Sequence, residues 1–231
     1  MSQNTSPAVM AQRKEPDDSL DFFPTPAWAT RALCCHVLGN ETLRNKVAWD
    51  PACGELHMVK PLEEFFKFVA RSDIFDYGVG AEVFDFLFQP ALATDWVITN
   101  PPFMLGEQFA LHALDLAEDG VAMFVRTQFL EGGGRFKNLF SKRRPASVAI
   151  FTERVPLFMG RVAKFIWKWD KHAKIYKKVK ASTATSYCWI VWRKNAPSYE
   201  TEFIWIPPCR ARLEREDDYP PLGPPPTEPP K

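Results

Sequence analysis

Short apolar runs that each stop at a polar residue constrain the fold of this chain more than any other feature of the sequence. Three runs typical of buried strands lead to Asp50, Asp73 and Asn100. Segments with helical spacing separate these runs, and this alternation predicts a mostly parallel sheet with helices on both faces. Ligands of such sheets bind at the carboxyl ends of the strands, so we expect the three side chains to line one site.

Further β-prone runs follow along the chain, at residues 121–125, 147–151, 187–192 and 203–206. No helical pattern separates the last two, so we expect antiparallel pairing toward the C-terminal edge of the sheet. Near the start of the chain, Thr25 and Pro26 are residue types favoured at an N-cap and at the first helical position. They predict a helix that begins there with Thr25 as its cap.

We expect a single domain over residues 21–207, flanked by segments of different composition. Residues 1–20 are mostly polar and predict a disordered N-terminal arm. Residues 208–231 are charged and rich in proline, and they predict an extended tail that is disordered and does not pack. Residues 161–180 form a basic, aromatic insertion within the domain.

The charge and cysteine content exclude several classes of protein. The formal net charge is +1, which excludes a uniformly basic coat for nucleic acid and leaves only a local patch. The five cysteines and four histidines lack metal-ligand spacing, so we expect no metal. No apolar run is long enough to span a membrane, and we expect a soluble protein of the cytoplasm.

The tetrapeptide Asn100-Pro101-Pro102-Phe103 follows a buried strand directly and suits methylation of an aromatic amine. The amine of adenine is a poor nucleophile because its lone pair is delocalised into the ring. Two fixed acceptors, the Asn100 side-chain oxygen and the Pro101 carbonyl, could bind both amine hydrogens and direct the lone pair at an electrophile. Phe103 offers a flat face for a base swung out of its helix. A plain strand-ending turn is the alternative for these residues taken alone.

A second segment, Asp50-Pro51-Ala52-Cys53-Gly54, has the position and composition of a ligand-binding corner between a strand and a helix. Gly54 permits close approach of a ligand to the backbone, and a helix N-terminus favours a carboxylate such as that of a methionine moiety. Asp50 could bind the ammonium group of the same ligand. Asp73, at the end of the next strand, suits a ribose diol.

The ordered set F-P-T-P, D-P-A-C-G and N-P-P-F resembles the amino-class DNA N6-adenine methyltransferases with motif order X, I, IV, above all the small phage- and prophage-type enzymes. The likeness covers about residues 21–192. It implies a Rossmann-like class I methyltransferase fold, S-adenosyl-L-methionine as cofactor, and methylation of the N6 amine of a flipped adenine in DNA. No nuclease motif is present, so no restriction partner is indicated.

The resemblance also implies roles for individual residues. The target base would be held by the catalytic residues Asn100, Pro101, Pro102 and Phe103. The cofactor would be bound by residues of motif X, of motif I and of the two strands that follow, namely Phe23, Thr25, Pro26, Asp50, Pro51, Ala52, Cys53, Gly54, Asp73, Asp85 and Phe86.

Two departures from the family pattern leave alternatives open. Leu56 stands where motif I usually has its second glycine, which questions cofactor binding and allows a non-catalytic nucleic-acid-binding relative. No separate target-recognition domain follows Trp192, so sequence recognition is expected to be minimal or to lie in loops. The N-P-P-F motif also serves transferases that methylate RNA adenine or other amine and amide nitrogens.

The insertion at residues 161–180 has the composition of a nucleic-acid surface. Lysines alternate with aromatic residues there, in a pattern typical of a hairpin strand, and cations bind phosphates while rings stack on exposed bases. A solvated hairpin is the alternative. The residues expected to contact DNA are Arg161, Lys164, Trp167, Lys168, Trp169, Lys171 and Lys174.

Overall fold

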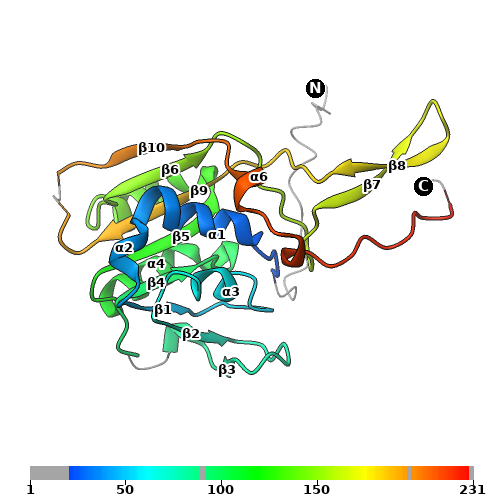
Figure 1. The fold of residues 1–231 in the computed structure, drawn as a ribbon. Helices are drawn as coiled ribbons and strands as arrows, with labels where there is room; N and C mark the ends of the chain where they lie inside the picture. Colours follow the sequence, from blue (N-terminus) through cyan, green and yellow to red (C-terminus); the bar gives the residue numbers. More distant parts are fainter. Residues whose placement is uncertain (1–20, 89–91, 197–198, 229–231) are drawn as a thin grey trace.

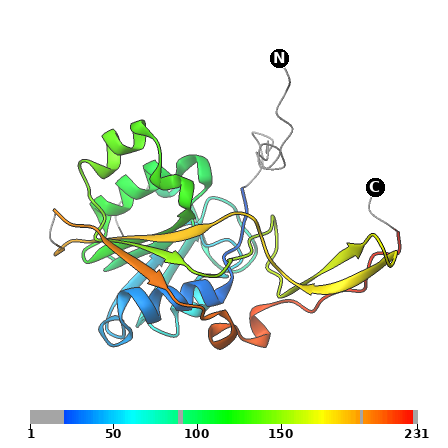
Figure 2. The same ribbon diagram turned by 90° about the horizontal axis from the view of Figure 1, so that it is seen from above.

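The computed structural model describes residues 21–88, 92–196 and 199–228. They form three layers, in which one mixed sheet lies between two groups of helices, and a hairpin projects from the body (Figures 1 and 2). The expected N-terminal arm, residues 1–20, lies outside the described residues. No helix in the described part of the chain is both long and apolar enough to cross a membrane.

The central sheet has eight strands in the order β10-β6-β9-β5-β4-β1-β2-β3. Their bounds are β1 Val47–Asp50, β2 Phe68–Asp73, β3 Glu82–Val83, β4 Trp96–Thr99, β5 Gly120–Arg126, β6 Ser147–Phe151, β9 Tyr187–Arg193 and β10 Glu202–Ile206. All neighbours pair in parallel except β9, which is antiparallel to both β5 and β6. The sheet is therefore mostly parallel, as expected.

The antiparallel strand differs from the expectation in position. It lies inside the sheet, between β5 and β6, whereas the outer edge is formed by β10, which is parallel to β6. Its central place agrees with its sequence, because six of the seven residues of β9 are buried.

The two faces of the sheet carry separate cores because successive strand residues point to opposite sides. Ala48 and Ile98 pack with the first core, whereas Trp49 and Val97 pack with the second. The first core is covered by α1 (Ala27–Leu33, continued by a π-helical turn at Cys34–Leu38), α2 (Asn40–Leu43), α3 (Val59–Leu62) and α6 (Arg210–Leu213). The second is covered by α4 (Gly106–Leu116) and by α5 (Gly133–Arg135) with the helical turn Phe136–Phe140.

The basic insertion forms a two-stranded antiparallel hairpin of β7 (Phe165–Asp170) and β8 (Ile175–Lys180), as its alternation predicts. The proline-rich segment after α6 runs along this hairpin as far as Glu228, the last described residue (Figures 1 and 2). The segment is extended, but it contacts the hairpin through hydrogen bonds from Trp167 and Tyr176.

Candidate active site

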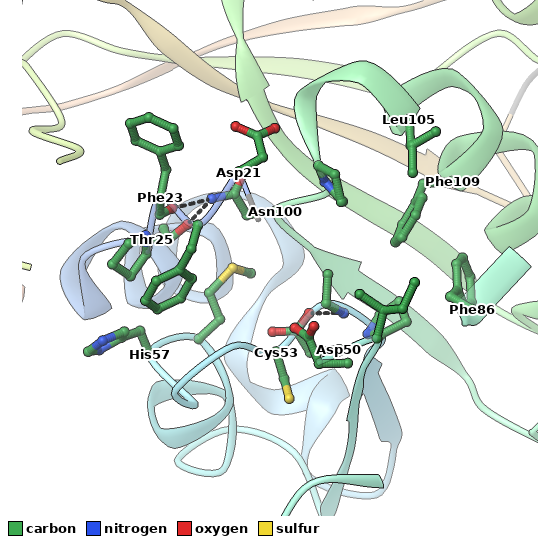
Figure 3. Close-up of a pocket in the computed structure, with 18 of the residues that line it drawn as sticks. Asp21, Phe23, Thr25, Asp50, Cys53, His57, Phe86, Asn100, Leu105 and Phe109 are labelled. Carbon is green, nitrogen blue, oxygen red and sulfur yellow. Dashed lines mark hydrogen bonds between the residues drawn. The ribbon is translucent and has the colours of Figure 1, made fainter. Parts of the chain in front are cut away.

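A cavity lies at the carboxyl ends of β1, β2 and β4, where the sequence places its three polar strand ends. The space inside it measures about 110 Å³, which is less than the ~300–1,000 Å³ typical of small-molecule sites. Asp50, Asp73 and Asn100 all line it, and Figure 3 shows Asp50 and Asn100 facing the same space from different strands. Parallel pairing of β1 with both β2 and β4 brings these strand ends together.

Asp50 is a buried acid at the end of β1. Only 1% of its surface is exposed, and the Ala52 amide donates to its carboxylate at 3.3 Å. Burial raises the pKa of Asp50 to about 7, against the opposing effects of the neighbouring Thr99 hydroxyl and the Ala52 amide. An acid without a compensating cation in the described residues is a fitting partner for a ligand that brings a positive charge.

Asp73 fastens the D-P-A-C-G turn to the end of β2. Its two carboxylate oxygens accept hydrogen bonds from the Gly54 amide at 2.8 Å and the Phe75 amide at 3.1 Å. Burial raises its pKa and these amides oppose the rise. Each carboxylate oxygen has a second lone pair, so the side chain can hold the turn and still accept a hydrogen bond from a ligand.

Gly54 is required at this turn for two reasons. Its φ of +49° lies in the left-handed region, and a Cβ there would approach the ring of Phe22 to 2.5 Å. Phe22 lies over the turn and contacts Tyr77, with ring centroids 4.9 Å apart. Both rings line the cavity and give it flat apolar walls.

Asn100 is fixed by the F-P-T-P segment. Its side-chain amide donates to the Phe23 carbonyl at 2.8 Å and to the Thr25 hydroxyl at 3.0 Å (Figure 3). The Phe23 carbonyl can only accept, so the NH₂ group must face it and the side-chain oxygen of Asn100 must face the other way. That oxygen is buried and has no hydrogen-bond partner among the described residues.

The prediction that Thr25 caps the first helix is wrong. Helix α1 begins at Ala27, Pro26 occupies the N-cap position, and no side chain caps the helix. The Thr25 hydroxyl instead accepts the hydrogen bond from Asn100. The apparent capping residue therefore belongs to the site and not to the helix.

The N-P-P-F loop separates two cavities. Asn100 and Pro102 line the first, and Pro101 and Phe103 line a second cavity on the far side. The Phe103 amide donates to the carboxylate of Asp21, which holds the loop.

The ring of Phe103 is covered by two neighbours. The ring of Phe23 lies 5.3 Å away, and the guanidinium of Arg126 lies 4.0 Å from the Phe103 ring centroid. Arg126 also lines the second cavity, and its Nε is buried without a partner among the described residues. A base that stacks on Phe103 must therefore displace this guanidinium or slide beneath it.

Leu56 does not enter the cavity. Its φ of +67° is the left-handed conformation that a glycine would adopt, and its side chain packs against the first core. The strain costs about 1–2 kcal/mol. The side chain that replaces the usual glycine therefore leaves the site open.

Most residues expected to bind the cofactor line the first cavity, namely Phe23, Thr25, Asp50, Pro51, Ala52, Cys53, Asp73, Asp85 and Phe86. Pro26 does not line it, and Gly54 contributes its amide to Asp73. Sequence reasoning missed Phe22, His57, Tyr77 and Arg126. Phe22 has a signal in the sequence, because F-F-P-T-P contains two adjacent rings and both line the cavity.

The hairpin projects from the same edge of the sheet as Asn100. Strand β6 is parallel to β5 because both pair antiparallel with β9, so the end of β6 and the start of β9 lie at the carboxyl edge. The hairpin connects these two points. Lys168, Lys171 and Lys174 are exposed on it, and Trp167 and Trp169 are half-buried. Arg161 and Lys164 lie in the segment before β7, which leads to the hairpin.

Comparisons with known proteins identify the fold. No family model and no curated protein matches the chain. A subunit described as the modification subunit of a type I restriction enzyme from Vibrio vulnificus YJ016 superposes with a TM-score of 0.51 and 12% identity, over 87% of this chain and 50% of that one. The type I restriction-modification methyltransferase subunit from Streptococcus thermophilus gives a TM-score of 0.50 and 14% identity, and the match covers 80% of this chain and 47% of that one. A protein described as an RNA methyltransferase from Pyrococcus horikoshii gives a TM-score of 0.49 and 18% identity. That match covers 82% of this chain and 95% of the other.

This chain spans about half the length of the two restriction-system subunits it resembles. At these identities the likeness concerns the fold alone. The chain has the Rossmann-like class I methyltransferase fold expected from its sequence.

Proposed function

We propose that this protein transfers a methyl group from S-adenosyl-L-methionine to the N6 amine of adenine in DNA, after the base has left the duplex. The observation that carries this proposal is the buried, unpartnered side-chain oxygen of Asn100. Leaving a buried acceptor unsatisfied costs about 1–3 kcal/mol. The cost is recovered when a ligand brings an N–H donor, and the exocyclic amine of adenine is such a donor.

The residues that line the first cavity suit the cofactor. Asp50 is a buried acid that would bind the ammonium of the methionine part, and Asp73 would accept from the ribose hydroxyls. Phe22, Tyr77 and Phe86 supply apolar walls for a flat ring. When bound, the cofactor supplies an activated methyl group on a sulfonium, so the protein needs no strong base.

The chain's own task is orientation. Asn100 and the Pro101 carbonyl would accept the two amine hydrogens, which turns the nitrogen lone pair out of conjugation with the ring and fixes its direction. The F-P-T-P segment prevents the Asn100 amide from flipping, because its NH₂ group is bound at two acceptors. Pro101 and Phe103 would receive the base in the second cavity, together with Arg126.

Nucleic acid would approach the carboxyl edge of the sheet, where both cavities and the hairpin lie. The exposed lysines of the hairpin would bind phosphates and its rings would contact unpaired bases. The net charge of +1 requires such a local surface.

A labelled-methyl assay tests the proposal. The protein is incubated with methyl-labelled cofactor and, separately, with duplex DNA, RNA and bulk protein, beside an Asn100→Ala variant whose cofactor binding is measured by calorimetry. We expect label in DNA, a loss of more than ~100-fold in the variant, and unchanged cofactor affinity. Label in RNA would favour the RNA enzyme, and absence of cofactor binding would favour the non-catalytic relative.

A further inference from the structure

The hairpin has one face that carries nearly all of its rings. Register places Trp167 opposite Lys178 and Trp169 opposite Tyr176, so these side chains share a side of the two-stranded sheet. We call Phe165, Trp167, Trp169 and Tyr176 the ring face. The Trp169 and Tyr176 rings lie 5.0 Å apart. This is the composition of a platform on which bases stack.

The chain's own C-terminal segment lies against this ring face. We call residues 220–231 the tail. The Trp167 indole N–H donates to the Gly223 carbonyl and the Tyr176 hydroxyl donates to the Glu228 carbonyl, both at 2.8 Å. A groove between hairpin and tail is lined by Phe165 and Trp167 on one side and by Leu222 and Pro224 on the other.

These contacts follow the physics of polyproline recognition. A proline-rich segment is already extended and exposes its carbonyls, so aromatic grooves with N–H or O–H donors bind it at little cost in entropy. The tail meets this description, with prolines at residues 220, 221, 224, 225, 226, 229 and 230.

Among the described residues, buried contacts hold only the base of the tail. Asp218, just before it, binds Arg31 through both carboxylate oxygens, and Tyr219 is buried. Beyond Tyr219, every described residue except Leu222 is exposed. The tail can therefore leave the ring face while its base stays in place.

We propose that the tail and nucleic acid are alternative occupants of the ring face, so that the hairpin binds unpaired bases only after the tail has been displaced. This rests on the proposed function for the hairpin as a nucleic-acid surface. A ligand whose site is free only part of the time binds with an affinity reduced by that fraction. The tail lowers the affinity for nucleic acid in this way.

Removal of the tail tests the proposal without changing the net charge, because residues 220–231 carry one acid, Glu228, and one base, Lys231. The full chain and a chain that ends at Tyr219 are compared for binding of a fluorescent single-stranded DNA of about 20 nucleotides, long enough to span one site. We expect the shortened chain to bind about tenfold more tightly, since two neutral hydrogen bonds and ring contacts hold the tail.

A double variant, Trp167→Phe with Tyr176→Phe, removes both donors and keeps a ring at each position. In the full chain it should tighten DNA binding several-fold, and in the shortened chain it should give no gain, because the tail is then already absent. Trp205→Phe, at a ring that is 65% exposed on β10, is the matched control and should change nothing.

Equal or weaker DNA binding by the shortened chain would overturn the proposal, as would an equal gain from the double variant in both chains. Binding needs neither cofactor nor methyl transfer, so this result is separate from the chemistry at Asn100. A chain that binds DNA but transfers no methyl group would refute the proposed activity and leave this test intact.

Discussion

The contact with Asn100 gives the F-P-T-P segment its role in the site, although the two are far apart in the sequence. Phe23 and Thr25 precede Asn100 by 77 and 75 residues, yet their oxygens bind its amide NH₂ group. The side-chain oxygen of Asn100 is buried and has no hydrogen-bond partner among the described residues. The N-P-P-F residues can be predicted as site residues from the sequence, because the motif directly follows a strand. The contact between Thr25 and Asn100 could not, because local sequence equally favours a helix cap.

Asp50→Asn is expected to stabilise the ligand-free protein above pH 7. The folded-state pKa of about 7 exceeds the ordinary value of 3.8, so the stability that Asp50 contributes is present below pH 4 and is lost as the pH rises through 7. Urea denaturation at pH 5 and pH 8 should show the wild-type protein losing stability relative to the variant. A constant difference between the two pH values would contradict the burial of this acid.

The same Asp50→Asn change should weaken cofactor binding by about 10- to 100-fold, because a charge-assisted hydrogen bond to the ligand ammonium is worth ~1.5–3 kcal/mol. Calorimetry at pH 7.5 checks this. If the variant is more stable and binds the cofactor as tightly as the wild-type protein does, Asp50 does not contact the cofactor.

Arg126→Ala should raise the KM for DNA about tenfold or more and change kcat by less than about threefold, since a buried donor that finds an acceptor in the substrate is worth ~1.5–3 kcal/mol. Arg126→Lys keeps the charge without the planar group and should be intermediate. Steady-state kinetics over a range of DNA concentrations separate the two constants. If KM stays unchanged in the Ala variant, Arg126 does not contact the base.

At the scale of elements, the strands with apolar interiors were predictable and the peripheral contacts were not. Strand β6 has the expected bounds because its apolar residues Val148 and Ala149 are buried, whereas β3 has only two residues, both exposed, and no apolar pattern. The tail was expected to be unpacked because its composition is typical of linkers. Its contacts depend on donors from Trp167 and Tyr176, more than 50 residues away, which no local pattern reveals.

Neutralising three exposed hairpin lysines, Lys168, Lys171 and Lys174, to Gln should weaken DNA binding and flatten its salt dependence. Each phosphate contact contributes about 0.9 to the slope of log K against log salt, so the slope should fall by about 2–3. The control is the same change at Lys67, Lys142 and Lys194, which are exposed elsewhere on the molecule. An equal slope in the two triple variants would exclude the hairpin from the DNA surface.

Arg31 is a buried cation that joins three parts of the molecule. Arg31 of α1 pairs with Glu64 at 2.9 Å and with Asp218 at 2.7 Å, and it also donates to the Leu213 carbonyl. Its side chain is 6% exposed, and desolvation is outweighed by these partners, which hold the pKa of Arg31 above its usual range. The C-terminal segment, the helix behind F-P-T-P and the loop after α3 thus meet at one guanidinium.

Arg31→Met should lower the free energy of unfolding by about 3–5 kcal/mol, because it leaves the buried Asp218 without its cation. Glu64 keeps its ion pair with Arg215. Arg143→Met is the control, since its pair with Asp115 is exposed on both sides and is worth about 0–1 kcal/mol. Thermal and urea denaturation of both variants would show the difference. Similar losses in the two variants would contradict the role of Arg31 as the anchor.

The identity of the methylated nucleoside tests the central claim most directly. DNA treated with the protein and cofactor is digested to nucleosides and analysed by mass spectrometry against the Asn100→Ala variant. Two acceptors that hold an exocyclic amine predict N6-methyladenine, absent from the variant sample. A methyl group on a ring nitrogen or ring carbon, or equal N6-methyladenine in the variant sample, would contradict it.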